Sequence, residues 1–251
     1  MATSKVALVT ASSAGLGAAI AKVLASEMRV IVNYSNSHDR ANAIVEDLRT
    51  LYPSSSQNPR FIAIQADVSK RSEIIRLVEE SVTTMGRLDV VVSNAGWTRM
   101  ANFHDLDDGV IEEEWDKCFN MNVKSHLFLM HAAKKYLDDT EGAFITTASV
   151  AGVKPSGSSL PYAVTKAAQI HLARSLAVIA APKIRVNSVS PGVLLTEWGL
   201  QFPEERLKAV KEKNILKKFA TVEDVAQQVK CLVLSQSVTG TNTIIDAGFT
   251  L

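Results

Sequence analysis

Residues 6–17 read Val6-Ala-Leu-Val-Thr10-Ala-Ser-Ser-Ala-Gly15-Leu-Gly17. The apolar run 6–9 predicts a buried β-strand, and the glycines that follow it predict a tight turn into a helix. In such a turn glycines let the backbone approach a pyrophosphate, whose charge faces the helix N-terminus. We therefore expect Gly15 and Gly17 to contact a cofactor, with Ser12 and Ser13 as hydroxyl donors. A plain strand–helix turn is the alternative, because the spacing is not GxGxxG.

The rest of the chain repeats this strand–helix alternation. Short, nearly continuous apolar runs predict strands at residues 5–10, 29–33, 60–65, 89–93, 143–147, 184–189 and 243–245. Periodic segments between them predict helices at residues 18–27, 40–50, 71–85, 123–137, 163–180 and 222–234. This pattern predicts an α/β, doubly wound Rossmann fold, with a mostly or wholly parallel seven-stranded sheet and helices on both faces.

Two stretches break this rhythm. Residues 155–161 are rich in Ser, Gly and Pro and read as a loop, whereas residues 193–214 hold Trp198, Phe202 and Pro203 with little periodicity. We interpret 193–214 as a substrate lid. With neither a linker nor a repeat in the sequence, we expect residues 1–251 to form a single dinucleotide-binding and catalytic domain.

Composition narrows the class of protein. The 251 residues carry 27 Lys and Arg against 26 Asp and Glu, so no basic field is available for nucleic acid. No apolar run approaches the roughly 20 residues of a membrane helix. Cys118 and Cys231 form no CxxC pair, and no targeting segment is expected before the first strand. We expect a cytoplasmic protein with reduced thiols.

The end of the second predicted strand bears on the choice of cofactor. It reads Asn33-Tyr-Ser-Asn-Ser-His-Asp-Arg40, and residues 28–38 contain no Asp or Glu that would grip an adenosine ribose. Ser35, Asn36 and Arg40 would tolerate a 2′-phosphate. The segment favours NADP(H) without excluding NAD(H), although Arg40 also fits a solvated residue in the first turn of a helix.

Tyr162 and Lys166 are four residues apart at the start of a helical pattern, so both project from one face. A free phenol has a pKa of about 10, and a neighbouring ammonium lowers it toward the range useful for acid–base catalysis. Ser149 ends a predicted strand thirteen residues before the tyrosine. Alone, this tyrosine and lysine would be a surface pair, and the serine a loop residue bonded to local backbone. Together they indicate a site for proton transfer.

The motifs, in their order along the chain, resemble those of the short-chain dehydrogenase/reductase family over essentially its whole length. The likeness is carried by the turn 10–17, Asp67-Val68, Ser93-Asn94-Ala95-Gly96, Trp115 with Asn122, Ser149 with Tyr162-Ala-Val-Thr-Lys166, Arg185-Val-Asn187-Ser-Val-Ser-Pro191-Gly192 with Thr196, and Asp246-Ala-Gly248. Three positions depart from the family pattern. Ala11 stands at its first glycine, where an alanine fits a right-handed backbone but its methyl group could crowd the turn. Ser93 replaces an Asn and Ala247 the middle residue of DGG.

The resemblance implies an oxidoreductase that transfers a hydride between NADP(H) and a carbonyl or secondary alcohol. Tyr162 would be the general acid and base, Lys166 would lower its pKa and hold a ribose, Ser149 would fix the substrate oxygen, and Asn122 would link Lys166 to solvent through a water. Cofactor contacts are expected at Thr10, Ser12, Ser13, Gly15, Leu16, Gly17, Asn33, Ser35, Arg40, Asp67, Val68, Asn94, Ala95, Gly96, Tyr162, Lys166, Pro191, Gly192, Val193 and Thr196.

Other partners follow less directly. Trp97, Arg99, Trp198 and Phe202 would flank the mouth of the pocket and grip a substrate, although packing explains them equally well. The five histidines form no ligand cluster, so no metal is expected. Apolar outer faces on the helices at 123–137 and 163–180 indicate a contact with another protein chain, and the resemblance implies a homotetramer or homodimer. The alternative function is a nucleotide-binding regulator or scaffold with this fold and no turnover.

Overall fold

The computed structural model describes residues 4–53 and 59–251. These residues form one sheet of seven parallel strands in the order β3-β2-β1-β4-β5-β6-β7. The strands are β1 (Val6–Val9), β2 (Arg29–Tyr34), β3 (Phe61–Gln65), β4 (Val90–Ser93), β5 (Ala143–Thr147), β6 (Arg185–Pro191) and β7 (Asn242–Ile245). The predicted fold class, a doubly wound parallel sheet, is confirmed.

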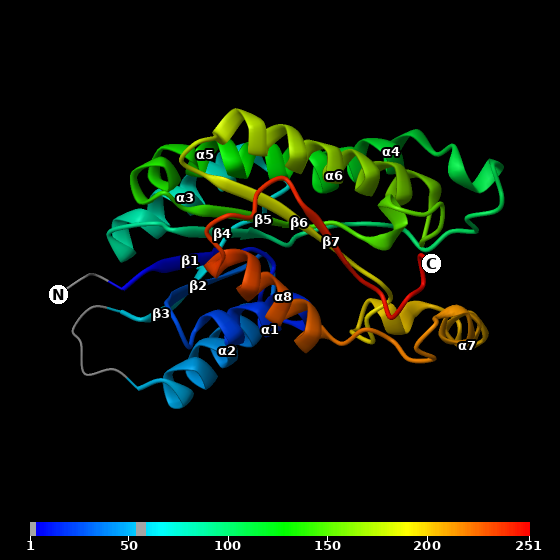
Figure 1. Ribbon diagram of the computed structural model, residues 1–251, viewed down its shortest axis with the longest axis horizontal. Coiled ribbons are helices and arrows are strands. Elements are labelled where there is room, and N and C mark those ends of the chain that lie inside the picture. The colour runs from blue at the N-terminus through cyan, green and yellow to red at the C-terminus, as the bar shows by residue number, and fades with distance from the viewer. Residues whose placement is uncertain (1–3, 54–58) are drawn as a thin grey trace.

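Helices cover both faces of the sheet (Figure 1). They are α1 (Gly15–Leu24), α2 (His38–Leu51), α3 (Arg71–Met85), α4 (Glu112–Phe119), α5 (Ser125–Thr140), α6 (Leu160–Ala180), α7 (Glu204–Lys213) and α8 (Val222–Leu234). The first strand shows how the two layers arise. Because side chains alternate along a strand, Val6 and Leu8 pack under α3, α5 and α6, whereas Ala7 and Val9 pack under α1, α2 and α8.

The functional edge of the sheet follows from its strand order. β1 pairs with β2 on one side and β4 on the other, so the chain changes direction across the sheet at this point. In open parallel sheets, ligands bind beyond the carboxyl ends of the strands at such a switch point. In Figure 1 the loops at this edge lie toward the right, beside α4 and α7.

Several predicted boundaries were wrong. α1 begins at Gly15, three residues before the predicted start, because the glycine turn is itself the first helical turn. The predicted loop 155–161 ends earlier, since Ser159 caps α6 and Pro161 lies in the first helical turn, where proline needs no hydrogen-bond donor. α4 was not predicted, and neither was α7, which lies inside the 193–214 segment.

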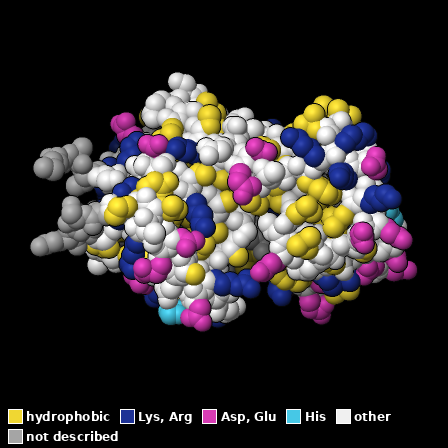
Figure 2. Space-filling model, turned by 90° about the horizontal axis from the view of Figure 1, so that it is seen from below, with side chains coloured by type: hydrophobic (Ala, Val, Ile, Leu, Met, Phe, Trp, Pro, Cys, Tyr) yellow, Lys and Arg dark blue, Asp and Glu magenta, His cyan; other side chains and the backbone are white. Residues whose placement is uncertain are grey.

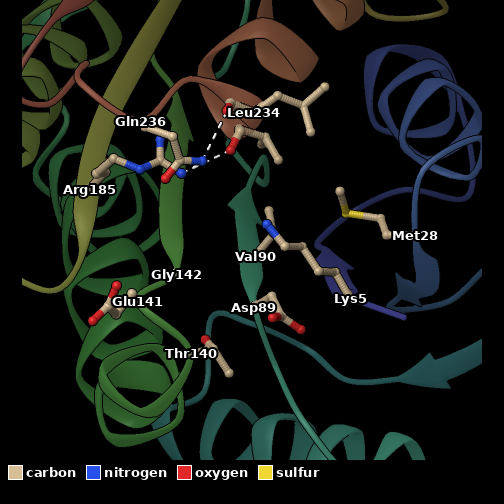
Figure 3. A pocket seen from close by; sticks show the side chains of 11 residues that line it. Lys5, Met28, Asp89, Val90, Thr140, Glu141, Gly142, Arg185, Leu234 and Gln236 are labelled. Carbon is tan, nitrogen blue, oxygen red and sulfur yellow. Dashed lines mark hydrogen bonds between the residues drawn. The ribbon is translucent and has the colours of Figure 1, made fainter. Parts of the chain in front are cut away.

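A cavity of about 220 Å³ opens at the opposite edge of the sheet, where the strands begin (Figure 3). Two of its charged side chains, Arg185 and Asp89, form hydrogen bonds that hold the fold together. Arg185 donates to the carbonyls of Leu232 and Val233 at the end of α8, each at 2.8 Å. Asp89 accepts from the Val6 N–H at 2.9 Å and from Arg87. These contacts secure the strand starts, and the candidate active site lies at the other edge.

Candidate active site

The turn between β1 and α1 has a left-handed residue at each end. Gly15 has φ +53°, and Ala11 has φ +50°. The expectation of a right-handed backbone at Ala11 is therefore wrong. Ala247, the other alanine that replaces a family glycine, also lies in the left-handed region, with φ +57°. In this region a Cβ approaches the following carbonyl oxygen, which costs about 1–2 kcal/mol for a residue other than glycine. Both alanines hold strained backbone.

We expect Ala11→Gly to raise the free energy of unfolding by about 1 kcal/mol, because relief of the left-handed strain outweighs the entropy that glycine gains in the unfolded chain. Urea denaturation followed by circular dichroism measures this. Ala19→Gly is the control, since in the interior of α1 the same exchange should lower stability by about 1 kcal/mol. Equal destabilisation by both variants would contradict strain at Ala11.

Close packing explains the second predicted glycine. A Cβ on Gly17 would lie 2.3 Å from the Ala11 carbonyl oxygen and 2.8 Å from Asn94 Nδ2. Glycine at this position therefore lets α1 begin directly against the turn. The open N–H groups of the first helical turn then face the edge of the sheet, where they can receive an anion.

Three of the predicted cofactor residues brace the turn with their side chains. Thr10 Oγ1 accepts from the N–H groups of Asn94 (2.9 Å) and Ala95 (3.3 Å). Ser12 is buried, and its hydroxyl donates to the Val9 carbonyl at 2.7 Å. Asn33 accepts from the Ala11 N–H at 3.1 Å and donates to β3 carbonyls. The hydroxyl of Ser12 is thus engaged within the fold and was predicted to face a ligand.

A groove of about 520 Å³ runs from this turn along the ends of β2 and β3. Its lining includes the predicted residues Asn33, Ser35, Asp67, Val68, Ala95 and Gly96, together with Asn36, Lys117 and Asn120, which come from separate elements. Asp67 accepts from the N–H (3.0 Å) and hydroxyl (2.7 Å) of Ser69. Those bonds lower the pKa of the Asp67 carboxyl against the effect of burial, so it is ionised at neutral pH. The lining residues of this groove could hold the adenosine half of a dinucleotide.

Arg40 lies at the start of α2 beside this groove. Its Nη1 is 2.8 Å from the Glu197 carboxylate, and both side chains are more than half exposed. Glu197 belongs to the 193–214 segment, 157 residues away. The ion pair therefore joins the predicted lid to the region where a 2′-phosphate was expected.

The end of β6 brings the remaining predicted cofactor residues to the turn. Gly192 donates to the Ile245 carbonyl at 2.9 Å, and a Cβ on Gly192 would meet Asp246 Cα at 3.0 Å. The chain then passes through Val193, and the Thr196 methyl group lies 3.4 Å from where a Cβ on Gly15 would stand. The chain from Pro191, the last residue of β6, through Gly192 and Val193 to Thr196 thus runs onto the glycine turn. Leu16 packs partly into the core beneath it.

The proposed catalytic side chains come from β5 and α6. Ser149 follows β5 and caps the short helix 150–152, accepting from the Ala151 N–H at 3.2 Å. Tyr162 and Lys166 lie in the first two turns of α6, and Lys166 Nζ is 5.5 Å from the centre of the tyrosine ring. The Ser149 hydroxyl is close enough to Tyr162 to favour a lower pKa of the phenol. Gly152 allows this approach, since a Cβ there would lie 2.5 Å from the Lys166 carbonyl carbon.

Burial dominates the acid–base properties of this group. It raises the pKa of Tyr162 to about 12, against the lowering effect of the Ser149 hydroxyl. It lowers the pKa of Lys166 to about 7. The expectation that the ammonium holds the tyrosine pKa below its ordinary value is therefore wrong, because loss of contact with water outweighs the lowering effects. At neutral pH the phenol carries its proton and can donate it.

Asn122 lies in a π-helical turn, η2 (Asn120–Lys124), between α4 and α5. Such turns are frequent at functional sites, and they leave the α-helical hydrogen-bond pattern. The buried Asn122 side chain accepts from the Trp97 N–H at 2.8 Å and donates to the Trp97 carbonyl (2.9 Å) and Thr165 (3.0 Å). A Cβ on Gly96 would be 3.4 Å from both Asn122 Oδ1 and Lys166 Nζ. The structure brings these two predicted residues together.

The predicted substrate residues have different surroundings. The Trp97 backbone is held by Asn122, and Lys117 Nζ lies 4.2 Å from the centre of its ring. Arg99 pairs with Asp108 at 2.6 Å and also with Glu114. Those two carboxylates engage the guanidinium that was expected to grip a substrate. Trp198 is partly exposed, and Phe202 lies 4.7 Å from the Arg206 guanidinium.

Two residues near Lys166 were missed by sequence reasoning. Gln169 accepts a hydrogen bond from Lys166 Nζ at 2.8 Å, and Thr165 holds Asn122. The Gln169 signal was readable, because a residue three positions after Lys166 lies on the same helical face. The Thr165 signal was weaker, since its role depends on a separate element.

Within residues 4–53 and 59–251, no three His, Cys, Asp or Glu side chains gather as a metal site. Over the same ranges, no helix has both the length and the apolarity to cross a membrane.

Comparison with known proteins identifies the class. A family model described as short chain dehydrogenase matches residues 5–206. The chain is 36% identical to the protein named ketoacyl reductase 2 of the granaticin polyketide synthase from Streptomyces violaceoruber, covering 97% of this chain and 95% of that protein. It is 31% identical to a Staphylococcus epidermidis 3-oxoacyl-(acyl-carrier-protein) reductase, with 97% and 98% covered.

Solved structures agree. A short chain dehydrogenase from Burkholderia cenocepacia in complex with NADP superposes with a TM-score of 0.88 at 32% identity, with 98% of each chain covered. The site and fold thus define an oxidoreductase that uses a nicotinamide cofactor. The chain belongs to the short-chain dehydrogenase/reductase family.

Proposed function

We propose that this enzyme reduces a carbonyl group with NADPH, or oxidises the corresponding secondary alcohol with NADP⁺, and that Tyr162 is the general acid and base. The observation that carries the proposal is the meeting of Ser149, Tyr162 and Lys166 beside a glycine turn and groove at one edge of the sheet. A partly buried phenol next to a buried amine has a chemical use in proton transfer.

When bound, the nicotinamide supplies or accepts a hydride. The residues that would hold the cofactor are those of the glycine turn, the groove and the end of β6. Close packing at Gly17 supports this fit, because it lets α1 begin directly against the turn, where the first N–H groups of the helix can face an anion.

The chain's own side chains handle the proton. In the reducing direction, Tyr162 donates its proton to the substrate oxygen as the alcohol forms. Ser149 hydrogen-bonds that oxygen and fixes its position next to the phenol. A protonated Lys166 stabilises the phenolate left behind. Asn122, in its π-helical turn, would relay a proton from solvent toward Lys166 through a water.

NADP(H) is the proposed cofactor. Residues 28–38 carry no carboxylate that would repel a 2′-phosphate, Ser35 and Asn36 line the groove, and Arg40 follows in the first turn of α2. A structural relative at 32% identity binds NADP. The Arg40–Glu197 ion pair is exposed and therefore contributes little free energy, so a phosphate dianion can displace the carboxylate.

The proposed substrate class is a 3-oxoacyl thioester or similar ketone. Relatives named as ketoacyl reductases support it. Segment 193–214 would act as a lid within a single catalytic domain. Exposed apolar side chains occur here at Leu195, Trp198 and Leu200, and Figure 2 shows hydrophobic side chains gathered on the face where α7 lies. They would cover an acyl chain.

Cofactor oxidation tests the function. NADPH and NADH are each mixed with the enzyme and a panel of acetoacetyl thioester, β-ketoester, aldehyde and quinone, and absorbance at the nicotinamide band is followed. We expect NADPH-dependent reduction of the thioester or ester. Arg40→Gln should raise the KM for NADPH about tenfold and leave that for NADH unchanged, since a phosphate contact is worth roughly 1.5 kcal/mol. No oxidation with any carbonyl would contradict the proposal.

We also propose that the enzyme is a homodimer or homotetramer. α6 exposes Val164, Val178 and Ile179 on its outer face, and α5 exposes Leu127. Such a patch favours self-association. Light scattering at micromolar concentration should give a multiple of 27.2 kDa, and a monomer at every concentration would contradict the proposal.

A further inference from the structure

A cluster of buried polar side chains lies one helical turn below the proposed catalytic residues. Gln169 follows Lys166 by three residues in α6, and His126 follows Asn122 by four residues, at the start of α5. Gln169 is 0% exposed and His126 is 1% exposed. A polar side chain that is fully buried costs free energy unless its hydrogen bonds are made, so each contact in this cluster matters.

Gln169 forms a closed ring of hydrogen bonds with the lysine. Lys166 Nζ donates to Gln169 Oε1 at 2.8 Å and to the Thr147 carbonyl at 2.9 Å. Gln169 Nε2 donates to the same Thr147 carbonyl at 3.0 Å. Two of the three ammonium protons are thereby directed away from solvent, and the position of Nζ next to Tyr162 is fixed from below.

His126 determines which way the Gln169 amide faces. The Gln169 nitrogen lies 3.1 Å from His126 Nε2 and also donates to Thr146 Oγ1. An amide nitrogen has two N–H groups and no lone pair to accept with, so its donors are shared among the Thr147 carbonyl, Thr146 Oγ1 and the neutral imidazole. Burial holds the pKa of His126 at about 3, which keeps the ring neutral. Ser93 Oγ, 2.6 Å from Nδ1, fixes the ring from its other side.

The orientation has a direct consequence for the lysine. If the amide were reversed, its NH₂ group would face the Lys166 ammonium, and its oxygen would face the Thr147 carbonyl. Both contacts would be repulsive. The imidazole and the Thr147 carbonyl together therefore orient the Gln169 amide so that its oxygen faces Lys166 and accepts a hydrogen bond from it. Gln169 shares α6 with Tyr162 and Lys166, and His126 lies on α5, directly after the π-helical turn that carries Asn122.

We propose that Gln169 and His126 are positioning residues that hold the Lys166 ammonium beside Tyr162. The inference rests on the proposed function, in which Lys166 stabilises the tyrosine phenolate. Neither residue touches the substrate or the cofactor in this scheme, since both act through the lysine.

The titratable groups around Lys166 come from three elements. They are Tyr162 on its own helix, Cys118 on α4 and His126 on α5. Burial raises the pKa of the Cys118 thiol to about 11, so at neutral pH both the thiol and the phenol are uncharged. The amide oxygen of Gln169 is then a principal neutral partner of the ammonium.

The first test measures the pKa of Lys166 directly. Protein labelled with ¹³C at the lysine ε-carbon is titrated by NMR without cofactor, and Lys166→Met identifies the signal. Gln169→Met, which keeps the volume but loses the acceptor, should lower the Lys166 pKa by about one unit. Gln169→Glu places a carboxylate there and should raise that pKa by about one unit or more. His126→Leu should shift it in the same direction as Gln169→Met.

The second test measures turnover, with whichever carbonyl compound of the substrate panel described above is reduced fastest. Gln169→Met and His126→Leu should each lower kcat about 10- to 100-fold, as loss of a supporting contact typically does, and leave KM within threefold. Gln169→Glu should move the pH at which kcat changes in step with the Lys166 pKa. His131→Leu, exposed on the same helix, and Gln227→Met, exposed on α8, are the matched controls and should change neither quantity.

An unshifted Lys166 pKa in Gln169→Met and Gln169→Glu would overturn the inference. So would a fall in kcat that tracks only a lower melting temperature, since that describes a structural role. If one glutamine variant fails to fold, the other and His126→Leu decide the matter. Absence of any turnover in the wild type would contradict the proposed function. The titration needs no substrate, so the measured Lys166 pKa values would still test the roles of Gln169 and His126.

Discussion

Tyr162→Phe is expected to lower kcat by a factor of about 10²–10⁴, because the exchange removes the proton that the substrate oxygen receives. The ring keeps its volume and its packing in the first turn of α6, so the free energy of unfolding should stay within about 1 kcal/mol of wild type. Burial raises the Tyr162 pKa to about 12, so the lost group is one that carries its proton throughout the neutral range.

Steady-state oxidation of NADPH with the best carbonyl of the panel measures this loss, and fluorescence titration with NADPH measures cofactor affinity separately. Affinity should be nearly unchanged, since the phenol acts on the substrate. Tyr52→Phe, at the end of α2 and away from the proposed catalytic group, is the matched control and should retain wild-type kcat. Turnover of Tyr162→Phe within a few-fold of wild type would contradict the assignment of the general acid.

The second large effect is expected from Gly152→Ala. A Cβ at this position would stand 2.5 Å from the Lys166 carbonyl carbon, 2.6 Å from the Ala167 nitrogen and 2.7 Å from the Lys166 oxygen. All three are backbone atoms of α6, so neither side can yield by rotating a side chain. The turn carrying Ser149 must move away from the helix carrying Tyr162 and Lys166.

Two measurements follow from that displacement. Overpacking should lower the free energy of unfolding by about 1–3 kcal/mol, as read by urea denaturation. Separation of Ser149 from Tyr162 by a fraction of an ångström or more should lower kcat about 100-fold. Gly86→Ala is the control, because its φ of +76° also strains an alanine, although nothing lies within 4 Å of the added Cβ. We expect it to lose stability and keep kcat, and equal kcat losses in both variants would contradict the argument.

The sheet could be predicted from the sequence because parallel strands buried on both faces appear as nearly continuous apolar runs. The runs at 6–9 and 90–93 are almost entirely apolar, and both lie in the sheet interior, paired with each other. Glycines mark the turn that receives the helix. Such signals are local, so they survive in a single sequence.

The backbone of Ala11 shows one limit of that reasoning. An alanine normally indicates right-handed φ, yet the angle is +50° because the turn must bring the carbonyl of Ala11 against Gly17 and Asn94. The constraint comes from β4, more than 80 residues later, and overrides local preference. Ala247 repeats the pattern at the far end of the chain.

Lys166 shows a second limit. The spacing of Tyr162 and Lys166 predicted that they share a helix face, and the structure confirms their proximity. The direction of their pKa values depended on how much water the fold leaves around them, which no spacing reveals. Contacts such as Arg40 with Glu197 likewise join positions 157 residues apart and require the folded chain.

The strand order also has a consequence for how the chain folds during its synthesis. β1, β2 and β3 leave the ribosome first and can pair among themselves, whereas the second neighbour of β1 is β4, made only after residue 90. Until then the run Val6–Val9, fully buried in the finished protein, presents an open and entirely apolar edge. Pairing across such a sequence separation is slow, and an uncovered edge invites association with other nascent chains. During synthesis, β1 therefore has an interval before β4 is made in which it is most prone to association with other chains.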